Sequence, residues 1–172
     1  MSETWRPVPG WVGFYEVSDL GQVRSVPRID SGGNRRRGLV RRAAPDRKGY
    51  LRVQLHRSGS RKSAKVHRLV LEAFVGPCPP DMEGCHGDGD PANNSLINLR
   101  WDTASANTFD SVRLGVHPQA SKRACPSGHP YSPENTYVYA SPRGWTARAC
   151  RVCKRAQHNR YKARQRAQRS IA

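Results

Sequence analysis

Four residues near the C-terminus have the types and the spacing of a metal site. Cys125 lies four residues before His129, and Cys150 and Cys153 flank two residues. Thiolate and imidazole are the usual ligands of tetrahedral zinc, and a close cysteine pair at the start of a helix is typical of small zinc modules. A module of this size has little hydrophobic core, so a structural zinc would supply much of its folding free energy. His158 in place of His129, and unrelated free thiols, are the alternatives.

A second group of chemically useful residues lies between residues 81 and 110. This segment holds six of the 13 acidic residues of the chain, together with His86. An imidazole with an unperturbed pKa of about 6.5 can accept a proton at neutral pH, and carboxylates bind divalent ions. In a chain of net charge +17, acids gathered in one place indicate either a local metal site or a solubilising surface. The six acids are Asp81, Glu83, Asp88, Asp90, Asp102 and Asp110.

The positive charge of the chain predicts a polyanionic partner. Lysine and arginine number 30 against 13 acids, and ten of them follow Glu134, after which no acid remains. Such a balance indicates nucleic acid; a basic protein without such a partner and a membrane-surface binder are the alternatives. No stretch combines basic residues with the wide apolar stripe of a membrane-surface helix, so no membrane partner is expected.

Composition limits the size of the hydrophobic core. Hydrophobic residues make up 36% of the 172 residues, below the roughly 45–50% of ordinary globular chains. Small cores tend to need metals, disulfides or a partner. The N-terminal MSETWRPVPG lacks the apolar segment of a signal peptide, and no stretch approaches membrane-spanning length. We therefore expect a cytoplasmic protein with reduced thiols, in which paired cysteines bind metal.

The period of the apolar residues predicts the elements that position these groups. Short strands are expected over residues 5–28 around a turn at 18–21, and residues 50–55 alternate apolar and polar side chains as a half-buried strand does. At residues 66–75 the period changes to that of an amphipathic helix, which a Gly-Pro pair ends. Between the first strands and residue 50 lies the basic, glycine-rich segment 30–38.

The second half of the chain contains two further predicted helices. Asp102 and Thr103 are good N-cap residues, and Gly115 suits the end of the helix that they begin. The cysteine module follows at 125–153, and an acid-free basic helix is predicted over 151–169. One sign of charge around a whole helix is unfavourable in isolation but favourable against phosphates; a disordered solubilising tail is the alternative.

The segment from Glu83 to Trp101 carries the most specific pattern of the sequence. It ends in Asn98-Leu99-Arg100-Trp101, and Asn107 follows on the next predicted helix. This pattern resembles the HNH nuclease motif, in the variety found in phage intron-encoded and free-standing homing endonucleases. The preceding Val66-His67-Arg68-Leu69-Val70 helix belongs to the same pattern.

The N-terminal segment resembles a nuclease-associated modular motif that occurs beside such domains. The residues that carry the resemblance lie between Trp5 and Ser25: Gly10-Trp11, Tyr15-Glu16-Val17-Ser18 and Gly21-Gln22-Val23-Arg24-Ser25. Together the two resemblances cover about residues 5–115.

The resemblance implies roles for three side chains in phosphodiester hydrolysis. In the family's ββα-metal fold a histidine at the end of the first strand activates water, so His86 is expected to be the general base. Asn107 is expected to bind one divalent ion through its amide oxygen, and Asn98 to fix the loop and the orientation of His86. The ion would stabilise charge on the phosphate and the leaving oxygen. A solvated or structurally satisfied histidine is the alternative reading of His86 alone.

One position departs from the family pattern. Homing enzymes of this type commonly have an aspartate before the catalytic histidine as a metal ligand, and this chain has Cys85. A thiolate is soft and binds Mg²⁺ poorly. Either Cys85 binds a softer ion, or a nearby carboxylate replaces it, with Asp88 and Asp110 as candidates; a buried, inert Cys85 is the alternative. Cys78 is left over and is expected to be structural.

We predict an α+β chain in which a ββα-metal (HNH) nuclease core lies between two small DNA-contacting parts. The parts are a strand-rich region at 1–60, the nuclease core at 61–115, a linker at 116–124, and a zinc-finger-like module with a basic helix at 125–172. Contacts to DNA phosphates are expected from basic residues of the first and last parts. These residues are Arg35, Arg36, Arg37, Arg52, Lys154, Arg155, Arg160, Lys162 and Arg164.

The predicted function is that of a homing-type, metal-dependent HNH endonuclease, encoded by a phage or prophage, that nicks or cuts double-stranded DNA to leave 3′-hydroxyl and 5′-phosphate ends. Mg²⁺, Mn²⁺ or Zn²⁺ would serve catalysis, beside one structural zinc. One active site per chain makes nicking natural for a monomer, whereas a homodimer could cut both strands. The alternative is a zinc-dependent DNA-binding protein or regulator with a decayed nuclease site, which Cys85 favours. RNA binding ranks last, because no aromatic-rich sheet motif is present.

Overall fold

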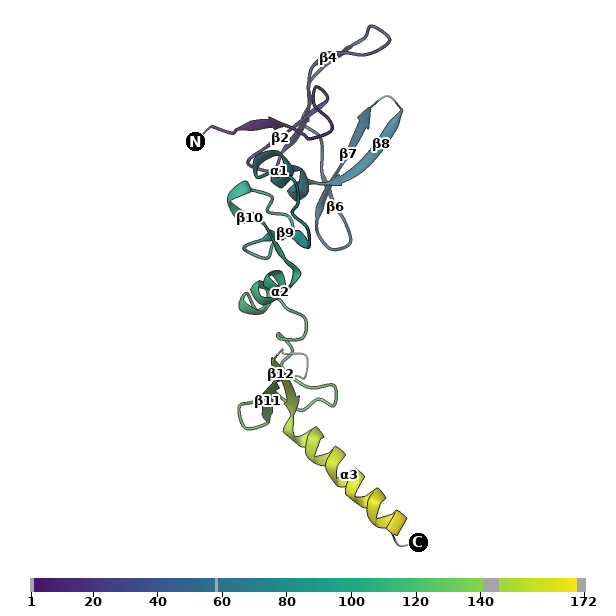
Figure 1. Cartoon of the computed structure of the whole chain (residues 1–172), viewed down its shortest axis with the longest axis vertical. Coiled ribbons are helices and arrows are strands. Elements are labelled where there is room, and N and C mark those ends of the chain that lie inside the picture. Colours follow the sequence, from purple (N-terminus) through teal and green to yellow (C-terminus); the bar gives the residue numbers. More distant parts are fainter. Residues whose placement is uncertain (1, 58, 141–145, 170–172) are drawn as a thin grey trace. The chain divides into compact units, whose positions relative to one another are not determined.

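The computed structural model describes residues 2–57, 59–140 and 146–169 (Figure 1). The chain forms two compact units, Met1–His117 and Pro118–Ala172. The first unit holds the residues expected to carry the nuclease chemistry, and the second holds the cysteine module.

A small antiparallel sheet begins the first unit. It consists of β1 (Trp5–Pro7), β2 (Tyr15–Ser18) and β3 (Val23–Ser25), paired in that order. The turn between β2 and β3 contains Gly21 at a φ of +82°, a backbone conformation that glycine adopts without strain. The short strands and the turn predicted over this segment are confirmed.

Two further sets of antiparallel strands follow. β4 (Arg28–Ile29) pairs with β5 (Arg35–Arg36). β6 (Ala44–Pro45), β7 (Leu51–Arg57) and β8 (Ser60–Lys65) form a three-stranded sheet with β7 in the middle. The alternation predicted for β7 is confirmed, because its two buried side chains are separated by a more exposed one.

Helix α1 (Val66–Phe74) begins directly after β8 and buries one face. The side chains of Val66, Leu69 and Val70 lie at helical spacing and are at most 5% exposed. They share one core with buried residues of the N-terminal sheet and of β7. The helix gives way to Gly76, whose φ is +124°. The predicted amphipathic helix is therefore confirmed, and its apolar stripe is the centre of the core.

A hairpin and a helix complete the first unit. β9 (Met82–His86) and β10 (Leu99–Thr103) pair antiparallel, and the long loop between them contains a 3-10 turn, η1 (Leu96–Asn98). Helix α2 (Ala104–Arg113) follows at once, because the Thr103 hydroxyl accepts a hydrogen bond of 3.2 Å from the backbone N–H three residues later. This strand–strand–helix order is the ββα arrangement that the sequence predicted.

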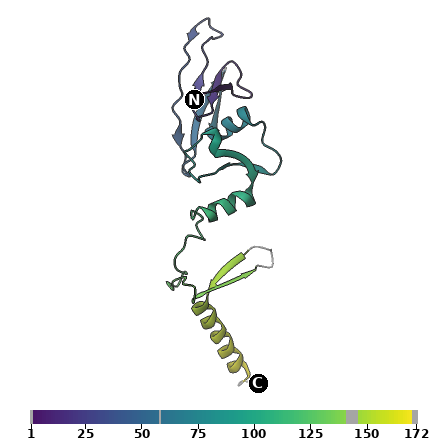
Figure 2. The same ribbon diagram turned by 90° about the vertical axis from the view of Figure 1, so that its left-hand side faces the viewer.

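The second unit is small and largely exposed. β11 (Thr136–Ala140) and β12 (Thr146–Cys150) form a hairpin that leads into α3 (Arg151–Arg169), as Figure 2 shows. No described residue of α3 is buried. The basic helix predicted for this segment is confirmed in its extent. Within the described residues, no helix combines the length and the apolar character that crossing a membrane requires.

The α+β class is confirmed, with a ββα core preceded by antiparallel strands. The parts expected at 1–60 and 61–115 belong to one compact unit. The boundary expected between residues 60 and 61 falls at the start of β8. Val53 and Leu55 of β7 pack in the same core as α1, so one hydrophobic cluster holds the two segments together.

We predict that Leu55→Ala destabilises the first unit strongly. Leu55 is fully buried in the shared core, and truncating a buried leucine removes its contacts and leaves a cavity, at a cost of about 2–5 kcal/mol. Urea unfolding followed by tryptophan fluorescence measures the change. Ile29→Ala is the control, because Ile29 is 70% exposed and should change the free energy of unfolding by less than about 0.5 kcal/mol. Equal effects of the two substitutions would contradict the described core.

Candidate functional site

His86 is the last residue of β9, where backbone pairing with Leu99 of β10 fixes its position. It is 7% exposed. The imidazole lies against two other rings, with centroids 5.0 Å from that of His67 and 5.8 Å from that of Tyr50. Burial lowers the pKa of His86 below its ordinary value. The ring is therefore neutral at neutral pH, which is the form that accepts a proton.

Asn94 indicates which nitrogen of His86 accepts that proton. The Asn94 amide nitrogen donates to the carbonyl of Ala92 at 2.9 Å, so the Asn94 carbonyl oxygen faces His86 Nε2, at 3.5 Å. A carbonyl oxygen can only accept, and the contact therefore favours the tautomer with its proton on Nε2. In that tautomer Nδ1 of His86 is the basic nitrogen.

Asn98 holds the loop that follows His86. Its side-chain oxygen accepts from the backbone N–H of Asp88 at 3.0 Å, and its side-chain nitrogen donates to Asp88 Oδ1 and to the carbonyl of Asn93, each at 2.9 Å. Its backbone carbonyl accepts from the N–H of Gly87 at 2.8 Å. Asn98, the last residue of η1, thus joins the end of the loop to its start and its middle.

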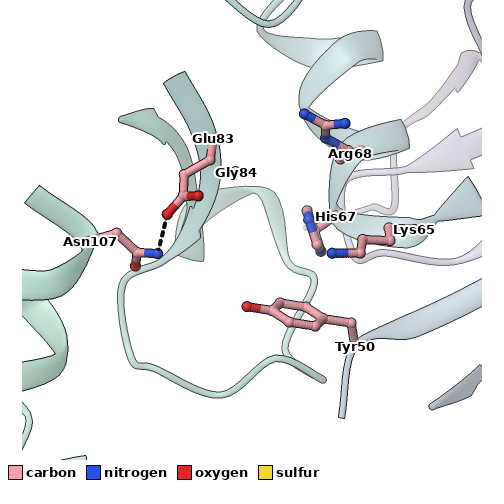
Figure 3. Close-up of a pocket in the computed structure, with 7 residues that line it drawn as sticks. All are labelled: Tyr50, Lys65, His67, Arg68, Glu83, Gly84 and Asn107. Carbon is pink, nitrogen blue, oxygen red and sulfur yellow. Dashed lines mark hydrogen bonds between the residues drawn. The ribbon is translucent and has the colours of Figure 1, made fainter. Parts of the chain in front are cut away.

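A cavity of about 270 Å³ lies beside this loop, between α1, β9 and α2 (Figure 3). One wall carries Asn107 and Glu83, and the Asn107 amide nitrogen donates to Glu83 Oε1 at 2.6 Å. Opposite them, Figure 3 shows basic and aromatic side chains that come from α1 and the strands before it. These side chains are Tyr50, Lys65, His67 and Arg68.

The sequence did not single out Glu83, Tyr50, Lys65 or His67 as site residues. Tyr50 and His67 come together only through the packing of α1 on the hairpin, with ring centroids 5.2 Å apart. Lys65 Nζ lies 4.3 Å from the centre of the Tyr50 ring. The available signal was weak: a histidine beside the apolar stripe of the α1 segment, and an acid two residues before Cys85.

His67 is nearly fully buried, with 3% of its surface exposed. Its Nδ1 has no hydrogen-bond partner among the residues that the structure describes. Burial, and then repulsion from the protonated form of His86, lower the pKa of His67 to about 3. The imidazole is consequently uncharged at neutral pH and adds no positive charge next to His86.

Cys85 lies on the opposite face of β9 from His86, as successive strand residues do. It is 1% exposed, and burial raises the pKa of its thiol to about 11. Its cross-strand partner, Arg100, forms an ion pair with Asp102 at 2.9 Å and another with Asp110. Asp110 also accepts from Arg113 at 2.9 Å. The Asp110 carboxylate is therefore engaged by two arginines.

Asp88 stabilises the loop after His86 through hydrogen bonds. Its Oδ1 accepts from the backbone N–H of Asp90 at 2.9 Å and from Asn98, and its Oδ2 accepts from the Asn93 amide at 2.6 Å. The hydrogen bond from the Asp90 N–H is the main reason why the pKa of Asp88 is lowered. Both oxygens of Asp88 are thus committed to holding the loop in place.

The N-terminal sheet touches the same loop directly. The backbone N–H of Leu96 donates to the carbonyl of Asp19 at 2.8 Å. A Cβ added to Gly21 would lie 2.7 Å from the Cβ of Asn94 and 2.9 Å from its backbone carbonyl oxygen. The β2–β3 turn therefore packs against the residue whose side chain faces His86.

The second unit brings together Cys125, His129, Cys150 and Cys153. Their ligand atoms all lie within 4.8 Å of one another. Sγ of Cys153 is 3.7 Å from Sγ of Cys125 and 3.3 Å from Nδ1 of His129. Thiolates at about 2.3 Å from a tetrahedral zinc stand about 3.8 Å apart, so the cluster could hold a metal ion of that kind. His158 is not part of the cluster.

The local structure of the second unit explains why these ligands converge. Cys150 ends β12, and Cys153 lies in the first turn of α3. The backbone N–H of Cys153 is the main cause that lowers the pKa of Cys150 to about 7. Asn135 donates to Cys150 Sγ at 3.4 Å, and its side-chain oxygen accepts from the N–H of Val152 at 3.2 Å. One asparagine therefore joins the cysteine pair to the loop before β11.

The basic residues expected to contact DNA lie on exposed surfaces within each unit. Arg35, Arg36 and Arg37 line a hollow of about 580 Å³. Arg52 donates to the hydroxyl of Ser63 at 3.0 Å, and its side chain is 37% exposed. The expected contact residues of α3 are all exposed. These are Lys154, Arg155, Arg160, Lys162 and Arg164.

Two protein families match the first unit. The family described as NUMOD4 motif matches residues 3–56, and the family described as HNH endonuclease matches residues 64–108. The chain carries a NUMOD4 motif followed by an HNH endonuclease domain. The resemblance drawn from its sequence is thereby confirmed, for the core and for the N-terminal motif.

Two curated relatives support the same family. The DNA endonuclease I-HmuI of Bacillus phage SP01 is 31% identical over 112 residues, which are 65% of this chain and 59% of that protein. The uncharacterized HNH endonuclease L245 of Acanthamoeba polyphaga mimivirus is 27% identical over 124 residues, which are 72% of this chain and 33% of that protein. The chain thus spans less than two thirds of the length of either relative.

A solved structure confirms the fold. This structure concerns DNA binding and cleavage by the HNH homing endonuclease I-HmuI. It aligns with the present chain with a TM-score of 0.55 at 25% sequence identity. The alignment covers 90% of this chain and 82% of that chain.

We predict that Gly21→Ala disturbs the His86 loop, whereas Gly13→Ala does not. Both glycines have a positive φ, and an alanine there costs about 1–2 kcal/mol of backbone strain. Only at Gly21 would the new Cβ also collide with Asn94, which should add about 1–3 kcal/mol. Urea unfolding measures the difference, and NMR of the imidazole signals should show His86 shifted in the Gly21 variant alone. Equal destabilisation with an unmoved His86 signal would contradict the contact.

Proposed function

We propose that the chain is a metal-dependent endonuclease that hydrolyses phosphodiester bonds of double-stranded DNA. The observation that carries this proposal is that one ββα unit holds all three expected residues. His86 ends the first strand, Asn98 ends the loop, and Asn107 lies on the helix. The homology to I-HmuI, a homing endonuclease that binds and cleaves DNA, supports it.

His86 is the general base in the proposed reaction. Nδ1 of the neutral imidazole takes a proton from a water molecule as the water oxygen attacks phosphorus. The bond between phosphorus and O3′ breaks, and O3′ takes up a proton from solvent, which leaves a 3′-hydroxyl and a 5′-phosphate. Asn98 and Asn94 act as positioning residues, because one fixes the loop after His86 and the other contacts its Nε2. Proton transfer of this kind contributes about 10²–10⁴-fold to a rate.

The cavity beside Asn107 offers the donors that a hard divalent ion prefers. The carboxylate of Glu83 and the side-chain amide of Asn107 both line the cavity, and oxygen is the ligand that Mg²⁺ and Mn²⁺ prefer. A bound ion would stabilise negative charge on the phosphate and on the leaving oxygen. Asn107 is the residue expected to hold it, through its amide oxygen.

DNA binding is proposed to depend on the basic surfaces of both units. The net charge of +17 is suited to phosphates, and phosphate contacts position a protein on DNA without reading its sequence. We propose zinc for the four-residue cluster in the second unit, where it would fix the hairpin to the base of α3. The phage relative favours action in the cytoplasm of a bacterial host.

The second candidate function is DNA binding without cleavage. The observation in its favour is Cys85, buried and protonated at the position where homing enzymes of this type commonly have aspartate. Incubation of supercoiled plasmid with the protein and Mg²⁺ or Mn²⁺ separates the two. Nicked or linear product supports the nuclease, and binding without product supports the regulator.

We predict that His86→Ala lowers the rate of plasmid cleavage by about 10²–10⁴-fold and leaves DNA affinity within about twofold. A general base acts in the transition state and contributes little to ground-state binding. Gel assays measure cleavage, and fluorescence anisotropy with a labelled duplex measures affinity. His56→Ala is the control, because His56 is an exposed histidine of the same unit. Cleavage by the His86 variant at the wild-type rate would remove His86 as the base.

We predict about one tightly bound zinc per chain after extensive dialysis. The double variant Cys150→Ala/Cys153→Ala should lose the zinc and the structure of the second unit, because metal binding and folding are coupled in so small a module. The first unit, with its own core, should keep its unfolding transition. Cys78→Ala is the control, since Cys78 lies outside the cluster. A double variant with its full zinc content would contradict the assignment.

A further inference from the structure

The cavity of Figure 3 is divided by charge. Glu83 and Asn107 form its oxygen-rich wall, and Lys65 and Arg68 belong to the opposite one. Glu83 makes no ion pair among the residues that the structure describes. A carboxylate without a basic partner, across a cavity from two basic side chains, suits a cation on one side and an anionic phosphate on the other.

Three other acids of the ββα unit are already engaged. Asp88 is held by loop hydrogen bonds on both oxygens. Asp102 and Asp110 are paired with Arg100. Among the acids of the ββα unit, Glu83 is the one whose carboxylate lines the cavity.

Cys85 is poorly suited to the ion. Its sulfur is buried, and its thiol donates to the Glu83 carbonyl oxygen at 3.5 Å. It does not line the cavity. Sulfur is also a soft donor, which Mg²⁺ and Mn²⁺ bind poorly in comparison with oxygen.

We propose that Glu83, together with Asn107, holds the divalent ion of this nuclease domain, and that Cys85 is a packing residue. The inference deepens the proposed function and rests on it. Mg²⁺ sites in proteins commonly have one or two carboxylates, with water and phosphate oxygens completing the coordination. Two protein donors beside a basic wall match that pattern. The missing aspartate is thus replaced two residues earlier on the same face of β9, where the alternation of a strand returns to the side facing α2.

The experiment measures Mn²⁺ binding to the zinc-loaded full chain by electron paramagnetic resonance, where bound Mn²⁺ removes the signal of the free ion. Wild type should bind one Mn²⁺, and Glu83→Gln should weaken its affinity at least tenfold. Glutamine keeps an oxygen that accepts from Asn107, so the contact between β9 and α2 is retained while the charge is lost. Asn107→Asp, which adds a carboxylate, should bind Mn²⁺ at least as tightly as wild type.

Two control variants test whether the loss of Mn²⁺ affinity is specific to Glu83. Cys85→Ser and Glu72→Gln should leave the Mn²⁺ affinity within twofold of wild type; the second makes the same change of charge outside the cavity. Unchanged affinity in Glu83→Gln, a tenfold loss in Cys85→Ser, or a wild-type chain that binds no Mn²⁺ overturns the assignment.

Plasmid cleavage distinguishes this failure from failure of the proposed function. If the wild-type chain cuts DNA and the Glu83→Gln variant binds Mn²⁺ as tightly as wild type, only the assignment of Glu83 as a metal ligand is overturned. A chain that binds Mn²⁺ through Glu83 but leaves plasmid intact overturns the nuclease function alone.

Discussion

Burial of the apolar face of α1 is the interaction on which the first unit depends. Val66 and Val70 are fully buried among side chains of the N-terminal sheet and β7, and the same helix packs on β9 through Leu71. Side chains gathered around a helix in this way contribute about 1.5–3 kcal/mol each on burial. Because α1 also carries His67 and Arg68, the packing that stabilises the fold places one wall of the cavity opposite the other.

Because side chains alternate along a strand, the functional groups of β9 lie on two opposite faces. His86 turns toward α1 and its aromatic neighbours, and Cys85 turns toward the arginine and the acids of the α2 side. Gly84 precedes Cys85 on β9, and a Cβ there would lie 2.9 Å from the ring of His67. The absence of a side chain at this position lets the helix approach the strand closely. His86 and Glu83 thus leave β9 on different faces of the strand.

Local structure determines where several of the residues expected to form the site lie. The roles expected of His86, Asn98 and Asn107 come from the resemblance to the HNH motif, and the structure places the three residues at the end of β9, at the end of η1 and in the first turn of α2. Tyr50, His67 and Glu83 received no individual role, because their meeting depends on the packing of distant elements. The same limit applies to the pairing of Asp88 with Asn98 and of Asp110 with Arg100, each of which joins residues ten positions apart. The grouping of Cys125, His129, Cys150 and Cys153 in the second unit was easier to predict, because the types and the spacing of these residues are typical of a small metal site.

The contact of the β2–β3 turn with the loop of the nuclease bears on how such proteins evolve. The NUMOD4 segment is recognisable by itself in sequence, which suggests a cassette that recombination can attach to any catalytic domain. Here Gly21 lies against Asn94 with no room for an extra carbon atom, and the carbonyl of Asp19 accepts a hydrogen bond from the N–H of Leu96. An exchange of either segment between lineages must therefore preserve both sides of this fit, so the two segments are expected to be inherited together as one evolutionary unit.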